Sequence, residues 1–291
     1  MSNKPMDINV FDETKITFKP ATKIQKGTSV VGHMFYLQYD GRYFPNIVLP
    51  NLKSQRIKVL ENPDGNTSYK ILFSFEGKDE DTPRGERLRS ALSKLHAINE
   101  RILDLIMETA RAPGGKAIFH PREKTADRET IKKRYKGLTW TFTREEDGSV
   151  MPDSMYCKII RDRDTPTVFR TVKGLPFMID SANKPITVTP DNIESIITRG
   201  SIVKPVVQGM SIFVAGKDSE ITNSWGFFHG RRVYQSPKEE YIMPEEEDGL
   251  EGLDRNVRTV DIAKDDSSDD SDEEEEEDEM DEEAQLAARS K

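Results

Sequence analysis

The sequence has a single cysteine, Cys157, among its 291 residues. One cysteine cannot form a disulfide within the chain, so we expect a protein that folds in a reducing compartment. Long apolar runs are also missing. No stretch approaches the roughly 20 apolar residues that a membrane-spanning helix needs, and residues 1–21 lack the apolar core of a signal peptide. We therefore expect an intracellular protein without membrane attachment.

Histidines and catalytic motifs are scarce as well. The four histidines are scattered singly, and none is spaced from another histidine or from Cys157 as metal ligands are: His33, His96, His120 and His229. Glycine-rich phosphate loops and nucleophile elbows are missing. The carboxylates lie in charge runs, so no pair stands out as a general acid and base. We predict that the protein is not an enzyme and uses no metal or other cofactor.

Charge is distributed unevenly along the chain. The whole sequence holds 43 Lys and Arg and 52 Asp and Glu, a formal net charge of −9. Residues 1–243 alone hold 38 Lys and Arg and 30 Asp and Glu, a net charge of +8. A basic body in an acidic chain indicates a polyanion or a membrane surface as the partner of the basic part.

The acidic residues gather near the C-terminus. Between Asp265 and Glu283 there are 15 carboxylates and no lysine or arginine. Such a segment cannot bury enough apolar surface to offset its ordering entropy, so we predict one domain over residues 1–243 and a disordered acidic tail over residues 244–291. The tail could compete with a polyanion for the basic body, or it could serve only solubility.

Alternating apolar and polar residues predict two β-hairpins in the first third of the chain. The first joins residues 34–39 and 42–49 through an Asp-Gly turn. The second joins residues 56–60 and 69–75 through a turn that contains proline and glycine. This part of the chain is expected to be an antiparallel sheet.

The apolar spacing then changes to that of a helix, from Leu88 to Ile106. Thr82 can cap the helix, Pro83 suits its first turn, and the Pro-Gly-Gly sequence at 113–115 ends it. We predict a long helix over residues 83–112, inserted between strands and packed on the sheet.

The second half returns to strands, with spacing typical of a sandwich or a small barrel. Short strands are predicted at residues 138–144, 155–160, 168–172 and 175–179. A short helix follows, capped by Thr189 and Pro190. A long strand is then expected over residues 202–213, bent at its proline and glycine, and it returns over residues 225–234.

Three segments place aromatic residues beside cations, a combination suited to nucleic acid. Rings stack on bases, at about 1–3 kcal/mol per base, while cations neutralise phosphates. The expected interface residues are Trp225, Phe227, Arg231, Arg232 and Tyr234, then Trp140, Phe142 and Arg144, and then Lys132, Lys133, Arg134 and Tyr135. Any one of these rings can instead belong to the core, because alternate residues of a strand point inward.

Residues 155–236 resemble a viral family, through five short sequences: TVTPDNI at 187–193, GSIVKPVVQ at 200–208, SIFV at 211–214, WGF at 225–227 and VYQ at 233–235. The family is that of the OB-fold single-stranded-DNA-binding-like proteins of large double-stranded DNA viruses. The resemblance implies a barrel that holds an extended strand, and an acidic tail that occupies the same surface when DNA is absent. We therefore expect a β-rich α+β fold, namely an OB-like antiparallel barrel with one long inserted helix and a disordered acidic C-terminal tail.

Two functions fit these features. In the first, the protein coats and protects single-stranded DNA during replication or repair of a viral genome, with replication proteins as further candidate partners. It would then act in the cytoplasm or nucleus of an infected cell, or travel in the virion, as a monomer or a homo-oligomer. In the second, it is an acidic-tailed chaperone or scaffold for basic proteins, in histone binding or virion assembly.

Overall fold

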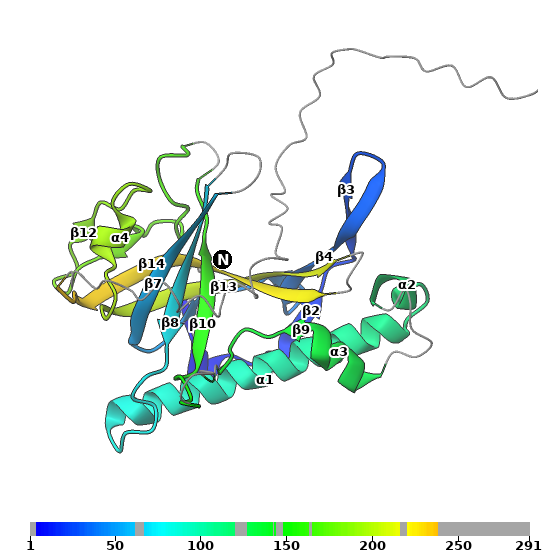
Figure 1. Cartoon of the computed structure of the whole chain (residues 1–291), viewed down its shortest axis with the longest axis horizontal. Coiled ribbons are helices and arrows are strands. Elements are labelled where there is room, and N and C mark those ends of the chain that lie inside the picture. The colour runs from blue at the N-terminus through cyan, green and yellow to red at the C-terminus, as the bar shows by residue number, and fades with distance from the viewer. Residues whose placement is uncertain are drawn as a thin grey trace, which may run out of the picture. The chain divides into compact units, whose positions relative to one another are not determined.

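The computed structural model describes residues 4–61, 67–119, 127–141, 143, 148–162, 165–215 and 220–237 (Figure 1). All of them belong to one compact unit. Within these ranges no helix combines the length and the apolar character needed to cross a membrane. The predicted acidic tail, residues 244–291, lies outside the described residues.

A closed ring of strands forms the centre of the fold. Its members are β7 (Leu52–Glu61), β8 (Thr67–Ser74), β10 (Ser154–Ile159), β13 (Ile202–Ala215) and β14 (Ile221–Tyr234). β8 pairs antiparallel with both β7 and β10, β10 runs parallel to β14, and β14 pairs antiparallel with β13. The ring closes where Val203 of β13 lies opposite Leu52 of β7. The fold is therefore the β-rich, OB-like barrel that was predicted, with one of its five pairings parallel.

Both predicted hairpins form, although the second strand of the first hairpin is shorter than the predicted residues 42–49. β4 (Ser29–Tyr39) turns into β5 (Arg42–Tyr43) through Asp40 and Gly41, whose φ angles are 52° and 68°. Two consecutive positive φ angles are the mark of a type I′ turn, which suits the twist of a hairpin. β7 and β8 form the second hairpin, although its turn at residues 62–66 lies outside the described part. The first hairpin is preceded by β3 (Thr22–Lys26), which the sequence analysis did not predict.

Further short segments extend the sheet around the barrel. They are β1 (Met6–Asp7), β2 (Ile16–Phe18), β6 (Ile47–Val48), β9 (Tyr135–Lys136), β11 (Met178–Ile179) and β12 (Pro185–Ile186), with the 3₁₀ turns η1 (Ile8–Val10) and η2 (Glu13–Lys15). β4 is central to this extension, because it pairs with β2, β3, β5 and β13.

The long helix α1 (Pro83–Arg111) begins and ends almost where predicted (Figure 1). The Thr82 hydroxyl accepts a hydrogen bond from the Gly85 backbone N–H at 3.1 Å, and Pro83 occupies the first turn. The apolar face of the helix joins the same core as the inward residues of β8 and β10: Leu88, Leu92, Leu95, Ile98, Ile102 and Ile106 pack there with Tyr69, Ile71, Phe73, Met155 and Cys157. Helix and barrel therefore share one interior.

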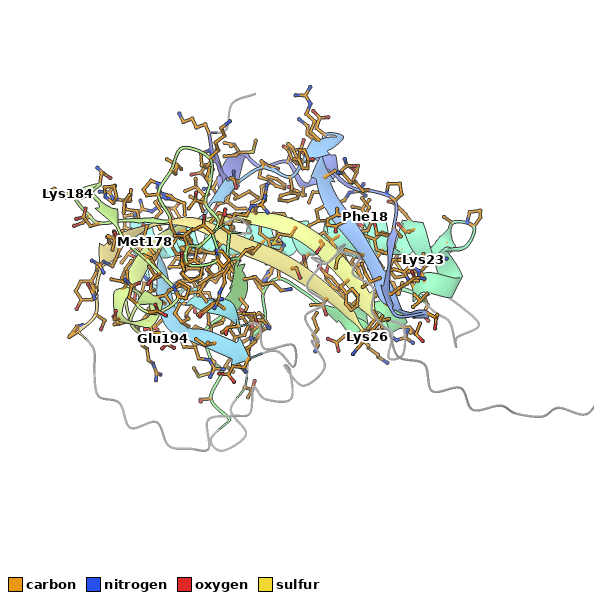
Figure 2. All side chains as sticks on the ribbon, turned by 90° about the horizontal axis from the view of Figure 1, so that it is seen from above. Phe18, Lys23, Lys26, Met178, Lys184 and Glu194 are labelled. Carbon is orange, nitrogen blue, oxygen red and sulfur yellow. The ribbon has the colours of Figure 1, made fainter. Side chains whose placement is uncertain are left out.

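Bulges bend the two longest strands. The register between β13 and β14 shifts at three places, two of which flank the predicted bends at Pro205 and Gly209. Gly209 has no room for a side chain, since a Cβ there would lie 2.9 Å from a Leu37 methyl carbon. Figure 2 shows the pair as a long curved ribbon between Met178 at one end and Lys26 at the other. The bend lets β13 pair with β4 at one end and with β7 at the other.

Several short elements differ from their prediction. The segments at 138–144 and 168–172 were predicted to be strands. In the described residues they form only isolated bridges, among them Trp140 with Ser154 and Arg161 with Phe169. The segment at 175–179 narrows to β11. The short helix is α4 (Ile193–Ile196), and its N-cap is Asn192 instead of Thr189 and Pro190. Two further helices follow α1, namely α2 (Gly115–Phe119) and α3 (Arg128–Arg134), and the sequence analysis did not predict them.

Candidate nucleic-acid interface

Three lysines form a row across the outer side of the barrel. Lys58 of β7 lies directly opposite Lys70 of β8, and Lys70 lies directly opposite Lys158 of β10. Directly opposed residues project from the same face with their Cβ atoms about 5 Å apart, and like charges in such pairs destabilise a sheet. Each of the three lysines also makes an interaction within the chain. Lys70, in the middle of the row, is only 9% exposed, so the end lysines, Lys58 and Lys158, are the cations of this row that a ligand can reach.

Two aromatic rings in tilted contact lie beside this row. Tyr156 precedes Lys158 by two residues on β10, so it projects from the same face. The rings of Trp140 and Tyr156 have centroids 5.0 Å apart and planes 31° apart. Arg56 donates a hydrogen bond from Nη2 to the Tyr156 hydroxyl at 3.2 Å. We refer to Arg56, Lys58, Lys70, Trp140, Tyr156 and Lys158 as the lysine face.

The local sequence explains why these side chains point outward. Met155, Cys157 and Ile159 alternate with the outward residues of β10 and are at most 4% exposed. Because successive residues of a strand point to opposite faces, this inward set fixes Tyr156 and Lys158 on the outside. Burial raises the pKa of the Cys157 thiol, which therefore stays protonated and belongs to the core.

An apolar cluster borders the lysine face on the side of β14. Gly226 lies opposite Lys158, and a Cβ on this glycine would come within 2.5 Å of the Phe228 ring. Phe228 packs with Val206 and Val172 in a cluster separate from the main core. The Arg170 guanidinium lies 5.8 Å from the centre of the Phe228 ring, so a further cation stands at this edge.

The sequence matches no protein-family model and no curated protein. Some solved phage proteins are similar to the described fold. The single-stranded DNA-binding protein of bacteriophage Enc34 in complex with ssDNA aligns with a TM-score of 0.35 and 10% identity, over 76% of this chain and 98% of that one. A second structure, gp2.5 of bacteriophage T7, a single-stranded DNA-binding protein, aligns with a TM-score of 0.38 and 15% identity, over 73% and 97%. Likenesses at this level do not place the chain in a family.

Two of the predicted stacking residues belong to the core. Trp225 is 1% exposed and Phe227 is 0% exposed. The Trp225 ring packs edge-on against Phe44 at 5.4 Å, and the Phe227 ring packs edge-on against Phe177 at 5.2 Å. The prediction that these rings stack on bases is wrong, because the inward set of β14 is Trp225 and Phe227, while the other set, Gly226 and Phe228, faces outward.

The remaining predicted residues of β14 lie near its C-terminal end. Arg231 donates from Nη2 to the Ser181 carbonyl oxygen at 2.7 Å, and Arg232 donates from Nη1 to the Ile196 carbonyl oxygen at 3.0 Å. Tyr234 is 54% exposed. The two arginines thus hold neighbouring loops to the barrel, and the structure does not bring them to the lysine face. Their role in binding stays a prediction.

Tyr135 is turned inward instead of standing among its neighbouring cations. Its hydroxyl donates to Oδ1 of Asn99 at 3.1 Å and accepts from Nδ2 of Asn223 at 2.9 Å. Burial raises the pKa of this phenol. The predicted cluster of a ring with Lys132, Lys133 and Arg134 is therefore not formed. Lys132 and Lys133 are exposed on α3, whereas Arg134 donates from Nη1 to the Phe119 carbonyl oxygen at 3.2 Å.

Among the predicted aromatic residues that the structure describes, Trp140 alone lies on the lysine face. Phe142 and Arg144, predicted beside it, lie outside the described residues. The lysines of the row were missed, although a shared signal exists: each sits between two apolar or aromatic residues, as in Ile57-Lys58-Val59 and Cys157-Lys158-Ile159. Only the strand register reveals that they meet. The described residues hold no group of three or more His, Cys, Asp or Glu placed to bind a metal ion.

Proposed function

We propose that this protein binds single-stranded DNA on the lysine face, and that it coats and protects the strand during replication or repair of a viral genome. The observation that carries the proposal is the directly opposed row of Lys58, Lys70 and Lys158 beside the aromatic pair Trp140 and Tyr156. Lysines on a line suit a backbone of phosphates, and rings beside them suit bases.

The chemistry favours a single strand over a duplex. Rings can stack only on bases that are free of their own neighbours, and unpaired strands present such bases. Lysine provides a point charge without the planar donor fork that reads base edges. Binding through lysines and rings should therefore tolerate many sequences, which suits a protein that coats DNA.

The proposal also gives the acidic tail a role, as a competitor of DNA. Its 15 carboxylates between Asp265 and Glu283 carry the charge pattern of a polyanion, so they would compete with DNA for the lysine face. Replication proteins as partners, self-association, and action in the infected cell or the virion belong to the same proposal.

The test compares charge-removing variants in salt-dependent titrations with a labelled oligonucleotide. The variants are Lys58→Gln and Lys158→Gln, at the two ends of the row, and their combination. Loss of a phosphate contact should lower the steepness of log affinity against log salt by about 0.7 per contact. The matched control is Arg87→Gln, an exposed cation on α1. An unchanged slope for the lysine variants would refute this site.

The acidic run also supports the chaperone or scaffold function, and deletion of residues 265–283 separates the two. A DNA-binding protein should bind DNA more tightly without the run, because an internal competitor is gone. A chaperone should instead lose its basic client, such as a histone, and show no gain in DNA affinity. The two outcomes exclude each other at low salt, where the charge of the tail is least screened.

A further inference from the structure

A second aromatic and basic patch lies on β2, β4 and β5. Tyr43 of β5 is 84% exposed, more than any other large apolar or aromatic side chain of the described residues. Lys19 Nζ lies 4.9 Å from the centre of the Tyr43 ring. The Lys19 backbone N–H donates to the Tyr36 carbonyl oxygen at 2.9 Å, which places Lys19 beside Tyr36 of β4. We refer to Lys19, Tyr36 and Tyr43 as the tyrosine patch.

Strand register places this patch on the same side of the sheet as the lysine face. Lys158 of β10 lies opposite Gly226 of β14. Ser224 is two residues from Gly226 on β14 and so projects from the same side, and it lies opposite Ser211 of β13. Ser211 in turn lies opposite Tyr36. Opposed residues, and residues two apart on one strand, project from one face. The row of lysines and the tyrosines therefore lie on the same side of the sheet.

The row between the two patches is covered by neighbouring side chains. Ser224 and Ser211 are each 6% exposed, and a Cβ on Gly226 would lie 2.5 Å from the Phe228 ring and 3.0 Å from the Met210 sulfur, so a strand that reaches both patches crosses over Phe228 and Met210. From β10 through β14 and β13 to β4 there are three strand spacings, or roughly 15 Å, and β5 pairs with β4 on the side where β13 lies. A single strand of the length that one OB-type barrel binds, up to about 16 nucleotides, can cover that distance.

The chemistry of the patch favours nucleic acid as its occupant. Tyr43 exposes its ring to water, and a cation stands over that ring, an arrangement that can hold a base on the ring and a phosphate on Lys19. The neighbouring side chains on this face are polar, Gln38 opposite Tyr43 and Thr17 opposite Gln38, unlike the apolar anchors typical of a protein interface.

We infer that the tyrosine patch is a second stacking site for single-stranded nucleic acid, used by strands long enough to extend beyond the lysine face. This inference rests on the proposed function, because it places the start of the strand on the lysine face. Short strands bind at the lysine face alone. Longer strands gain affinity from Tyr36, Tyr43 and Lys19.

The test measures affinities of the full chain for oligothymidines of about 5 and about 15 nucleotides. Tyr43→Ala should weaken binding of the longer oligonucleotide by about 5- to 150-fold, the value of one stacked base, and should change binding of the shorter one by less than about 2-fold. Tyr43→Phe, which keeps the ring, should bind both lengths like the parent. Thermal melting should be the same for all three proteins, because the residue is exposed.

Each other outcome overturns the inference. Equal weakening for both lengths would make Tyr43 part of the minimal site, and no weakening for either would remove it from binding. A change in oligomeric state of Tyr43→Ala without a length-dependent loss would assign the patch to a contact between copies of the chain. Failure of the proposed function looks different, since the parent protein would then bind neither oligonucleotide.

Discussion

The indole nitrogen of Trp225 donates a hydrogen bond to Oδ1 of Asn223, 3.1 Å away on the same strand. Asn223 in turn donates from Nδ2 to the Tyr135 hydroxyl, and that hydroxyl donates to Oδ1 of Asn99 on α1. The Asn99 oxygen also accepts from the Leu138 backbone N–H at 2.9 Å. This chain of polar groups connects β14, β9 and α1, and it explains why two aromatic residues predicted for DNA binding serve the fold instead.

Removal of the Tyr135 hydroxyl should destabilise the protein without weakening DNA binding. Tyr135→Phe leaves Nδ2 of Asn223 without this acceptor, and we expect a loss of about 1–2 kcal/mol in the free energy of unfolding. Denaturant unfolding measures the change. The control is Tyr234→Phe, since Tyr234 is exposed at the end of β14 and should change stability by less than about 0.5 kcal/mol. A loss of oligonucleotide affinity in Tyr135→Phe, with the fold intact, would restore Tyr135 to the interface.

The two tryptophans should report differently on bound DNA. Trp140 is on the lysine face, whereas Trp225 is in the core, so a stacked base should change only the fluorescence of Trp140. Trp140→Phe should abolish the change that an oligonucleotide causes, and Trp225→Phe should keep it. A signal that survives in Trp140→Phe would place the DNA elsewhere.

Acid should weaken the contact between Asp153, the residue before β10, and Lys78, in the turn that precedes α1. Burial alone would raise the pKa of Asp153, but hydrogen bonds from Lys78, at 2.5 Å, and from Thr141 outweigh it, and the pKa is lowered from 3.8. A carboxyl whose folded pKa is depressed contributes stability above its unfolded pKa and loses it as pH falls through the folded value. Stability should therefore decline as pH falls below about 4.

The measurement is chemical unfolding of the parent and of Asp153→Asn at neutral pH and at a series of acid values. The variant should be less stable at neutral pH, and the difference from the parent should shrink as acid protonates Asp153 in the parent. Asp191→Asn, at an exposed position, is the matched control and should differ little at any pH. A difference that stays constant across the acid range would contradict the role assigned to the ionised carboxylate.

Local features of the sequence predicted the elements whose signals are themselves local. The cap at Thr82 and the 3.6-residue spacing defined α1 almost to the residue, and the Asp-Gly turn located the first hairpin, whose second strand ends at Tyr43 instead of Leu49. Local features did not predict which side of β14 faces the core. Its aromatic residues include neighbours in sequence, Phe227 and Phe228, so either alternating set of side chains could face inward. Burial of Trp225 and Phe227 is decided by partners far away in the sequence, such as Phe44 and Phe73.

The lysine face depended on register, which the sequence did not reveal. Lys70 and Lys158 are 88 positions apart, and nothing near either one marks the other as its neighbour. Trp140 was predicted because an aromatic residue near cations is visible locally, whereas its stacking partner Tyr156 was not. Short segments such as 168–172 resembled strands by composition, yet in the described residues Phe169 makes a single bridge, to Arg161, with a backbone hydrogen bond on either side of it.

Closure of the barrel has a consequence for how the protein becomes active during its synthesis. The pair that closes the ring joins Leu52 of β7 to Val203 of β13. These residues are 151 positions apart, so β7 gains this neighbouring strand only after that length of chain has been synthesised. Contacts of such long range form slowly, because the entropy of closing the intervening loop must be lost first. A chain still on the ribosome carries its lysines on separate strands, and we expect it to acquire affinity for DNA only in a late, cooperative step.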